Sequence, residues 1–392
     1  MLIKIFFRKT WERSIDLLNK LLPKKKQVLL IGNHQIEDNI IELANYLAAN
    51  TNYKVICEIS ESYFDKASSF LDRRVKLENS EKKIKCLFLA LRSSHIIYTY
   101  PYSLAFYTKS KRQKFINLWH GVGHKKIGKL AGRAGVPADI SVATSEMIRT
   151  KFSKTFGVPE NSFITAGYPR NDRMLISQEN KDAHKKKLNS VFQEYDKILI
   201  WMPTYRRIYS GNKSELPTGN SIDLDHVFQV ENFNVKKFNL LLRKHNALCF
   251  VKPHQLYQLK ENSLLLSNIR VIDNNWIYRF NISLYQFLGL TDALITDFSS
   301  VMTDYTLLEQ PIFCFATDLE DYKKSGNLYF EDYENYIPTK FIENQNEFFK
   351  NIEEFLISGL DKNEIQRKRV KDLYFKFKDT KNSERIANKI FN

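Results

Sequence analysis

Short apolar runs alternate with longer segments of helical periodicity along most of this chain. In the first half the apolar runs are QVLLIG, KVICEI, HIIYTY, FINLWH and ISVATS, and segments such as DNIIELANYLAAN lie between them. A second series begins at KILIWMP and continues through ALCFVKP, IRVID, DALITD and PIFCFA, with helical patterns such as NVKKFNLLLRKHN among them. Alternation of this kind predicts an α/β fold in which helices flank parallel sheets.

The two series are separated by a polar, lysine-rich segment that runs from Ser177 to Asp196. A chain of 392 residues exceeds what one hydrophobic core usually supports, so two domains are expected. We predict one Rossmann-like domain at residues 27–193 and a second at 194–392, the second ending in one or two terminal helices. Because ligands of open parallel sheets lie beyond the carboxyl ends of the strands, a site is expected in a cleft between these domains.

The first 26 residues read as a separate basic, amphipathic segment. They carry eight Lys or Arg against two acidic residues, and their apolar residues have near-helical spacing. Charges interrupt the segment too often for a signal peptide, and no stretch reaches the roughly 20 apolar residues that a membrane-spanning helix needs. Two interpretations remain open, namely a helix lying on an anionic membrane surface and an ordinary helix packed on the first domain.

The composition favours anionic partners. Sixty Lys and Arg against 44 Asp and Glu give a formal net charge of +16, which suits phosphorylated substrates, acidic lipid or nucleic acid. The four cysteines lie far apart and form no CxxC pair. This spacing argues against a disulfide framework or a zinc site and favours a reduced, cytosolic setting.

The segment NLWHGVGHKKIGK follows one of the apolar runs and carries His120 and His124. Its glycines do not make a dinucleotide fingerprint, because Lys126 stands where the third glycine would be. The two histidines have the i, i+4 spacing of metal ligands on a helix, but Gly121 and Gly123 disfavour a helix there and therefore a metal site. We interpret the segment as a flexible basic loop at a strand end, suited to holding phosphate, with a merely basic surface as the alternative.

The segment DALITDFSSVMTDYTLLEQ carries a second candidate site. Thr296 and Asp297 end a predicted strand, and Ser299 and Ser300 stand where a helix should begin. Hydroxyls and free backbone N–H groups at such a point predict an anion site, most usefully for a diphosphate. The plainer alternative is that these side chains only cap the helix.

Further polar side chains also follow apolar runs: Lys252 and His254 in FVKPHQ, Arg206 in MPTYRR, and Arg170, Asn171 and Asp172 in GYPRND. We predict that all of these except His254 bind substrate, as do Thr296 and Asp297. Arginine forks match phosphate oxygens, and a histidine beside a lysine at a strand end is a candidate catalytic group. The carboxylates that would hold Mg²⁺ are not clustered in these motifs, which predicts a transfer that needs no metal and no cofactor.

Together these motifs resemble the CDP-glycerol glycerophosphotransferase family, the teichoic-acid primases and polymerases, whose members also build phosphate-linked capsules. The resemblance spans about half of the chain, in the family's order, through LWHG (118–121), KKIG (125–128), GYPRND (167–172), PTYR (203–206), KPH (252–254), TDFSSVMTDY (296–305) and DLEDY (318–322). It implies a GT-B-like fold, with two Rossmann-type domains facing across a cleft.

The resemblance also implies an activity. The chain would move a polyol phosphate, glycerol phosphate first among the candidates, from a CDP-polyol to a hydroxyl of a lipid-linked or growing teichoic-acid or capsule acceptor, releasing CMP. The donor would bind the second domain near Arg206, Ser299, Ser300 and Asp304. His120 and His254 match the family's two catalytic histidines, and we assign His120 as the base, although the two could exchange roles.

The same resemblance implies a cytoplasmic enzyme attached peripherally to the inner face of a bacterial membrane, with no nucleic-acid partner. Glycerol or ribitol, primase or polymerase, and teichoic acid or capsule stay open. The chain departs from the family's pattern at Val122 to His124, where a Thr-Pro or similar pair is frequent, at Thr303, where an aromatic is common, and at Tyr205, where Trp is frequent. These departures bear on which polyol or acceptor is accepted.

Two other functions fit parts of the pattern. A GT-B glycosyltransferase would use a nucleotide sugar and leave phosphate with the nucleotide. A binder of nucleic acid or acidic membrane without catalysis would rest mainly on the charge of +16. We rank it last because the basic and aromatic residues form no recognisable nucleic-acid module.

Overall fold

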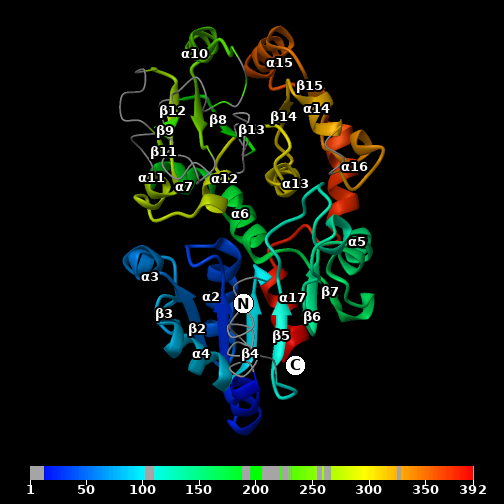
Figure 1. Cartoon of the computed structure of the whole chain (residues 1–392). Coiled ribbons are helices and arrows are strands. Elements are labelled where there is room, and N and C mark those ends of the chain that lie inside the picture. The colour runs from blue at the N-terminus through cyan, green and yellow to red at the C-terminus, as the bar shows by residue number, and fades with distance from the viewer. Residues whose placement is uncertain are drawn as a thin grey trace. The chain divides into compact units, whose positions relative to one another are not determined.

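The chain forms two compact units, each built on its own parallel sheet (Figure 1). The computed structural model describes residues 13–101, 110–187, 195–204, 221–222, 228, 230, 232–253, 258–259, 266–324 and 328–391. Unit 1 comprises residues 1–120, 127–173 and 374–392, and unit 2 comprises residues 121–126 and 174–373.

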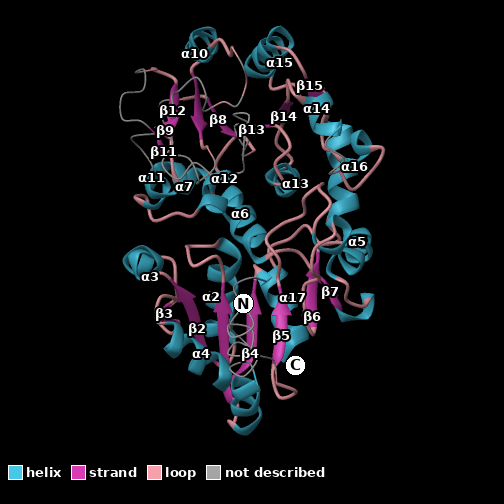
Figure 2. Ribbon diagram, viewed as in Figure 1, coloured by secondary structure: helices cyan, strands magenta, loops and turns pink. Residues whose placement is uncertain are grey.

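The sheet of unit 1 has seven strands in the order β3-β2-β1-β4-β5-β6-β7. They are β1 (Lys25–Ile31), β2 (Lys54–Ile59), β3 (Lys76–Asn79), β4 (Ser93–Tyr98), β5 (Lys114–Asn117), β6 (Ile140–Ala143) and β7 (Phe163–Thr165). Every neighbouring pair is parallel. The central strands are continuous apolar runs because helices cover both faces, as Figure 2 shows.

The helices that accompany this sheet include α2 (Asp38–Asn50), α3 (Phe64–Ser68), α4 (Lys83–Arg92), α5 (Glu146–Phe156) and α17 (Asn382–Phe391). Helix α5 shows how local sequence sets an element's ends. The Ser145 hydroxyl accepts from the backbone N–H of Ile148 at its start, and Gly157 takes the left-handed conformation (φ 70°) at its end.

Unit 2 repeats the same winding with six strands in the order β12-β10-β8-β13-β14-β15, all parallel. They are β8 (Lys197–Met202), β10 (Ala247–Val251), β12 (Ile269–Val271), β13 (Ala293–Thr296), β14 (Ile312–Phe315) and β15 (Phe341–Ile342). A separate parallel pair joins β9 (Ser221–Ile222) to β11 (Gln258–Leu259). The helices are α7 (Lys181–Lys187), α10 (Val235–Lys244), α11 (Asn274–Tyr278), α12 (Leu284–Leu288), α13 (Val301–Tyr305), α14 (Leu319–Lys324), α15 (Gln345–Ser358) and α16 (Glu364–Tyr374).

The predicted α/β class with two Rossmann-type sheets is confirmed, and each predicted strand is present. The helical pattern DNIIELANYLAAN coincides with α2. The short strands β3, β7 and β15 were not predicted, because they lie at or next to the sheet edges and offer only two to four residues of apolar pattern. The predicted cleft between domains stays a prediction.

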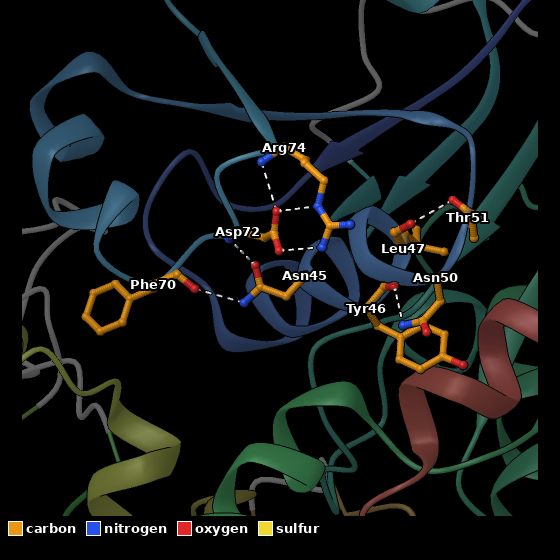
Figure 3. Close-up of polar contacts among 8 residues, drawn as sticks. All are labelled: Asn45, Tyr46, Leu47, Asn50, Thr51, Phe70, Asp72 and Arg74. Atoms are coloured by element: carbon orange, nitrogen blue, oxygen red, sulfur yellow. Dashed lines mark hydrogen bonds and ion pairs between the residues drawn. The ribbon is translucent and has the colours of Figure 1, made fainter.

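Helix α2 also anchors the loop between α3 and β3 (Figure 3). The Asn45 side-chain amide donates to the Phe70 carbonyl at 2.8 Å, and its oxygen accepts from the Asp72 backbone N–H at 2.7 Å. Asp72 in turn holds Arg74 through two side-chain hydrogen bonds. The middle of α2 is thereby fixed to the loop that enters β3.

The units divide at a different place from the predicted boundary near residue 193. The division falls between Arg173 and Met174, inside the continuous helix α6 (Pro169–Glu179), and residues 374–392 return to unit 1. The polar segment at 177–196, which suggested the boundary, begins inside that helix and continues into α7. Composition alone does not separate a linker from an exposed helix.

Helix α17 belongs to unit 1 for two physical reasons. Its Ile386, Ala387 and Ile390 are buried in the same apolar cluster as residues of α2. Its first backbone N–H groups, those of Asn382 and Ser383, donate to the Asp172 carboxylate at 2.9 and 2.8 Å, and the Ser383 hydroxyl donates to it at 2.9 Å. Asp172 therefore satisfies the otherwise unpaired start of a helix 210 positions further along the chain.

The predicted N-terminal segment is described only in part. Residues 13–21 are helical, whereas residues 1–12 lie outside the described residues. Ile15, Leu18 and Leu22 pack against Leu87 and Leu91 of α4. The inward face of this helix is thus packed on unit 1, as the second of the two interpretations of this segment expected. Among the described residues, no helix is both long and apolar enough to cross a membrane.

The contacts of Asp172 predict a stability effect. Replacing Asp172 with alanine leaves buried N–H groups of α17 without a partner, so the free energy of unfolding should fall by about 1–3 kcal/mol. Denaturant titration followed by circular dichroism measures the change. Asp182, exposed on α7, supplies the control D182A, which should leave the midpoint unchanged. Equal stability of D172A and D182A would contradict the capping role.

Candidate active site

The polar residues of unit 1 gather at the carboxyl ends of three neighbouring strands, β1, β4 and β5. The winding of the sheet reverses between β1 and β4, which is where open parallel sheets bind ligands. The segments that leave these strands carry Glu37, Thr99 and His120, and the first turn of α6 contributes Arg170. Of these four residues, His120 and Arg170 were predicted from the sequence, and Glu37 and Thr99 were not.

The backbone before His120 is held in an unusual conformation. Trp119 has φ 61°, which is uncommon for a bulky residue. Its N–H donates to the Asn117 side chain at 2.9 Å, and its carbonyl accepts from the Asn39 side chain at 3.3 Å. Its ring packs against Phe156, with centroids 4.7 Å apart. Buried contacts on both sides of the backbone therefore maintain the turn that presents His120.

The ring of His120 has a defined tautomer. Nδ1 lies 3.2 Å from the Thr99 carbonyl oxygen. Because a carbonyl can only accept, Nδ1 must carry the proton, and the lone pair of the neutral ring is then on Nε2. The ring stacks on Tyr100 with centroids 4.3 Å apart and planes 6° from parallel. Such a fixed imidazole is suited to take a proton at Nε2.

The electrostatic environment keeps this imidazole neutral. Burial lowers the pKa of His120 to about 4, the charge of Arg170 acts in the same direction, and the hydrogen bond to Thr99 opposes them. At neutral pH the ring is therefore uncharged, with Nε2 free of a proton, which is the state that a general base requires.

Arg170 contacts the protein backbone. Its guanidinium NH1 donates to the carbonyl oxygen of His120 at 2.7 Å, and its own backbone N–H donates to the Asn39 side chain at 3.2 Å. The side chain is buried, as is that of Asn171. These contacts make Arg170 a positioning residue for His120. Its predicted contact with substrate stays a prediction, as does that of Asn171.

Asp172 makes structural contacts, and its predicted contact with substrate stays a prediction. Both carboxylate oxygens accept hydrogen bonds from the start of α17. Burial raises the pKa of Asp172 to about 6, against the effect of these hydrogen bonds. No local sequence pattern indicates this role, because the partner lies at the far end of the chain.

Glu37 is an acidic residue of this site that was not predicted from the sequence. The Thr99 hydroxyl donates to its Oε2 at 2.8 Å, while its Oε1 is buried and has no hydrogen-bond partner among the described residues. Burial raises the pKa of Glu37 to about 7, and the Thr99 hydrogen bond, the charge of Arg170 and the backbone N–H of Asn33 only partly offset this effect. The available signal was its place in the polar segment GNHQIED, directly after a predicted strand.

In unit 2 the corresponding reversal of winding lies between β8 and β13. The hydroxyl of Thr204, after β8, donates to Asp297 at 2.5 Å, and its backbone N–H donates to the same carboxylate at 2.9 Å. The Thr296 hydroxyl donates to the Met202 carbonyl at 2.7 Å. Thr296 and Asp297 therefore join two strand ends, a structural role that the prediction of substrate binding did not include.

Ser299 and Ser300 are partly exposed beyond this junction. Ser300 precedes α13 with helical backbone angles, and its side chain makes no capping hydrogen bond. The alternative that this hydroxyl only caps the helix is therefore wrong for Ser300. Helix α13 spans five residues and passes directly into a short 3₁₀ turn (Thr306–Leu308), so it is a weaker anion site than a long helix would be.

Two more predicted residues of unit 2 are buried. Lys252 directly follows β10, and burial lowers its pKa to about 8 against the attraction of Asp273. Asp304 accepts a hydrogen bond from the Tyr285 hydroxyl at 2.8 Å and is almost fully buried, so its observed contact is internal. Arg206 and His254 lie outside the described residues.

The glycine loop after His120, residues 121–126, packs within unit 2. The Thr303 hydroxyl lies 3.3 Å from the Val122 carbonyl oxygen and 3.3 Å from Nε2 of His124. The His124 carbonyl accepts from the backbone N–H of Tyr329 at 2.8 Å. His124 is thus a buried, hydrogen-bonded residue of the loop. In the described ranges, no group of three or more His, Cys, Asp or Glu is arranged to hold a metal ion.

Solved structures with the same fold are teichoic-acid and nucleotide-sugar proteins. The wall teichoic acid polymerase TagF superposes with a TM-score of 0.74 over 99% of this chain and 94% of its own, at 19% identity. The UDP-GlcNAc 2-epimerase from Neisseria meningitidis gives a TM-score of 0.58 over 94% and 99%, at 10% identity. At these identities the likeness shows the fold alone.

Curated relatives come from teichoic-acid synthesis. The ribitol-phosphate polymerase TarL of Staphylococcus aureus is 24% identical over 79% of this chain and 53% of its own length. The teichoic acid ribitol-phosphate primase of Bacillus spizizenii is 24% identical over 95% and 93%. The chain thus spans about half the length of TarL but nearly all of the primase.

A family model covers almost the whole chain, residues 15–392. It describes CDP-glycerol:poly(glycerophosphate) glycerophosphotransferases, and its span includes both sheets and every predicted site residue. The chain therefore belongs to the CDP-glycerol:poly(glycerophosphate) glycerophosphotransferase family.

Proposed function

We propose that this chain transfers a polyol phosphate, glycerol phosphate first among the candidates, from a CDP-polyol to a hydroxyl of a growing teichoic-acid or capsule acceptor. The observation that carries the proposal is the fixed, neutral imidazole of His120 at the carboxyl end of a Rossmann-type sheet. Family membership supplies the reaction class.

In the proposed reaction the acceptor hydroxyl gives its proton to Nε2 of His120 as its oxygen attacks the phosphorus that bears the polyol. The new P–O bond forms while the bond to the CMP phosphate breaks, and CMP leaves with the electron pair. Negative charge spreads over the transferred phosphate and the leaving group. Lys252 and the hydroxyls of Ser299 and Ser300, with Arg206 and His254 from the sequence motif, would stabilise it. The reaction is proposed to need neither metal nor cofactor.

Substitution of the histidines tests the mechanism. His120→Ala should lower kcat by about 10²- to 10⁴-fold, because it removes the base. His254→Ala should cause a loss of similar order. The measurement is CMP release from CDP-glycerol in the presence of an acceptor. His184→Ala, on α7, is the control and should retain activity. Near-normal turnover of folded H120A would refute the proposed base.

A donor titration tests the substrate class. Isothermal titration should show binding of CDP-glycerol or CDP-ribitol and of CMP, and none of UDP-glucose. Because no cluster of carboxylates was predicted, affinity should be the same with and without Mg²⁺. Preference for UDP-glucose would contradict the proposed donor and favour the alternative function, that of a glycosyltransferase.

We also propose that unit 1 docks on the anionic inner face of the membrane, where a lipid-linked acceptor would be presented. Leu17 and Leu21 of the N-terminal helical segment are exposed, as are Ile84 and Phe88 of the neighbouring α4. Lysines accompany them at positions 20, 82, 83 and 85. Exposed apolar side chains among lysines are typical of surfaces that insert into an anionic bilayer interface.

Replacing Leu21 with serine should weaken binding to phosphatidylglycerol vesicles several-fold, because about 1–2 kcal/mol of apolar burial is lost. Vesicle sedimentation measures the partitioning. Leu240 of α10 is a matched control, since its exposed fraction is 61% against 70% for Leu21. If L21S and L240S partition alike, this surface does not dock on membranes.

A further inference from the structure

Glu37 occupies a position that the fold alone does not explain. It immediately precedes α2, at the N-cap, yet its side chain makes no capping hydrogen bond. Glutamate is also not among the residues that helix N-caps prefer. Its carboxylate is turned to the end of the strand β4, where it meets the Thr99 hydroxyl at 2.8 Å. A role in helix capping is therefore excluded.

The same residue, Thr99, contacts both Glu37 and His120. Its side-chain hydroxyl donates to Glu37 Oε2, and its backbone carbonyl accepts from His120 Nδ1. Glu37 is thus linked through one residue to the imidazole proposed as the base. Glu37 follows strand β1 and His120 follows strand β5, and both of these strands neighbour β4 in the sheet.

Residue 32 leaves space for this carboxylate. A Cβ atom at Gly32 would lie 2.6 Å from Glu37 Oε2 and 3.3 Å from Cγ1 of Ile40. A side chain at position 32 would therefore displace the carboxylate from the strand end. The absence of a Cβ at this point permits the observed position of Glu37.

The second carboxylate oxygen of Glu37, Oε1, indicates which kind of ligand group could bind beside it. Oε1 of Glu37 is buried without a hydrogen-bond partner among the described residues. A carboxylate oxygen accepts hydrogen bonds and repels phosphate oxygens, so its complement is a neutral donor such as a hydroxyl. Buried acceptors normally find a donor, and in an enzyme site the substrate can supply it.

We propose that Glu37 binds a hydroxyl of the acceptor polyol, the one next to the hydroxyl that His120 deprotonates. This proposal rests on the proposed function and deepens it, because it assigns the acceptor's terminal diol to unit 1. Glu37 selects a terminal residue that carries two adjacent hydroxyls over one that carries a single hydroxyl. Phosphate is directed away from this carboxylate.

The charges around Glu37 set the pH dependence of this contact. Arg170 on α6 favours the ionised carboxylate, Asp38 on α2 disfavours it, and the neutral His120 adds no charge. Burial outweighs the favourable contributions and raises the pKa of Glu37 to about 7. The ionised form is the better hydrogen-bond acceptor, so affinity for the acceptor rises as pH increases through about 7.

The test uses the full chain, CDP-glycerol as donor and two synthetic acceptors. One is a tri(glycerol phosphate) with a terminal glycerol, and the other ends in 1,3-propanediol, which lacks the secondary hydroxyl. Glu37→Ala should raise the acceptor KM about tenfold or more for the glycerol-ended trimer, with donor affinity unchanged. The wild type should prefer the glycerol-ended trimer, whereas E37A should not distinguish the two.

Two further variants separate binding from folding and from base catalysis. Glu37→Gln keeps an accepting oxygen, so it should restore part of the acceptor affinity and abolish the pH dependence near 7. Gly32→Ala should raise the acceptor KM as E37A does, because it displaces the carboxylate. Glu160, exposed in the short 3₁₀ turn Glu160–Ser162 that follows α5, supplies the matched control Glu160→Gln, which should behave as the wild type does.

Unchanged acceptor KM and unchanged discrimination in E37A would overturn the assignment. A loss of kcat in E37Q of 100-fold or more with unchanged acceptor KM would also overturn it, since Glu37 would then be the base. Failure of the proposed function looks different, because the wild type itself would release no CMP with either trimer. That result would remove the acceptor assignment together with the function.

Discussion

Parallel pairing is the constraint on which both candidate sites depend. Every described pair in the two main sheets is parallel, so all strands of a sheet end at one edge. Side chains that follow those ends are gathered there even when they are far apart in the sequence, as Glu37, Thr99 and His120 are. The reversal of winding after the third strand of each sheet then separates the helices on either side and leaves room for a ligand.

Much of this arrangement could be predicted because it depends on local pattern. Apolar runs gave the strands, and the residues that follow them gave His120, Lys252 and Ser300. The roles of Asp172 and Asp304 could not be read in the same way, because their partners, the start of α17 and the hydroxyl of Tyr285, are set by tertiary contacts. Glu37 was missed for a related reason: nothing in a sequence shows which oxygen of a carboxylate stays unpaired.

Two of the expected departures from the family's pattern contact each other in the structure. Thr303 and the Val122 to His124 segment were noted separately as unusual, yet the Thr303 hydroxyl contacts both the Val122 carbonyl and His124 Nε2. A larger aromatic side chain at 303 would occupy the space of these contacts. The residues at the two departures therefore contact each other, and these contacts hold the loop that begins one residue after His120.

Burial shifts the pKa values of His120 and Glu37, two titratable groups of the candidate site, in opposite directions. It lowers the pKa of His120 to about 4 and raises that of Glu37 to about 7, because in each case it disfavours the charged form. The charge of Arg170 lowers the pKa of both groups. It therefore favours the neutral imidazole of His120, which can accept a proton, and the ionised carboxylate of Glu37, which can accept hydrogen bonds. A site of two uncharged or weakly charged acceptors beside a buried arginine suits an acceptor hydroxyl better than a phosphate. The net charge of +16 must then reside on other parts of the chain, where it favours anionic partners.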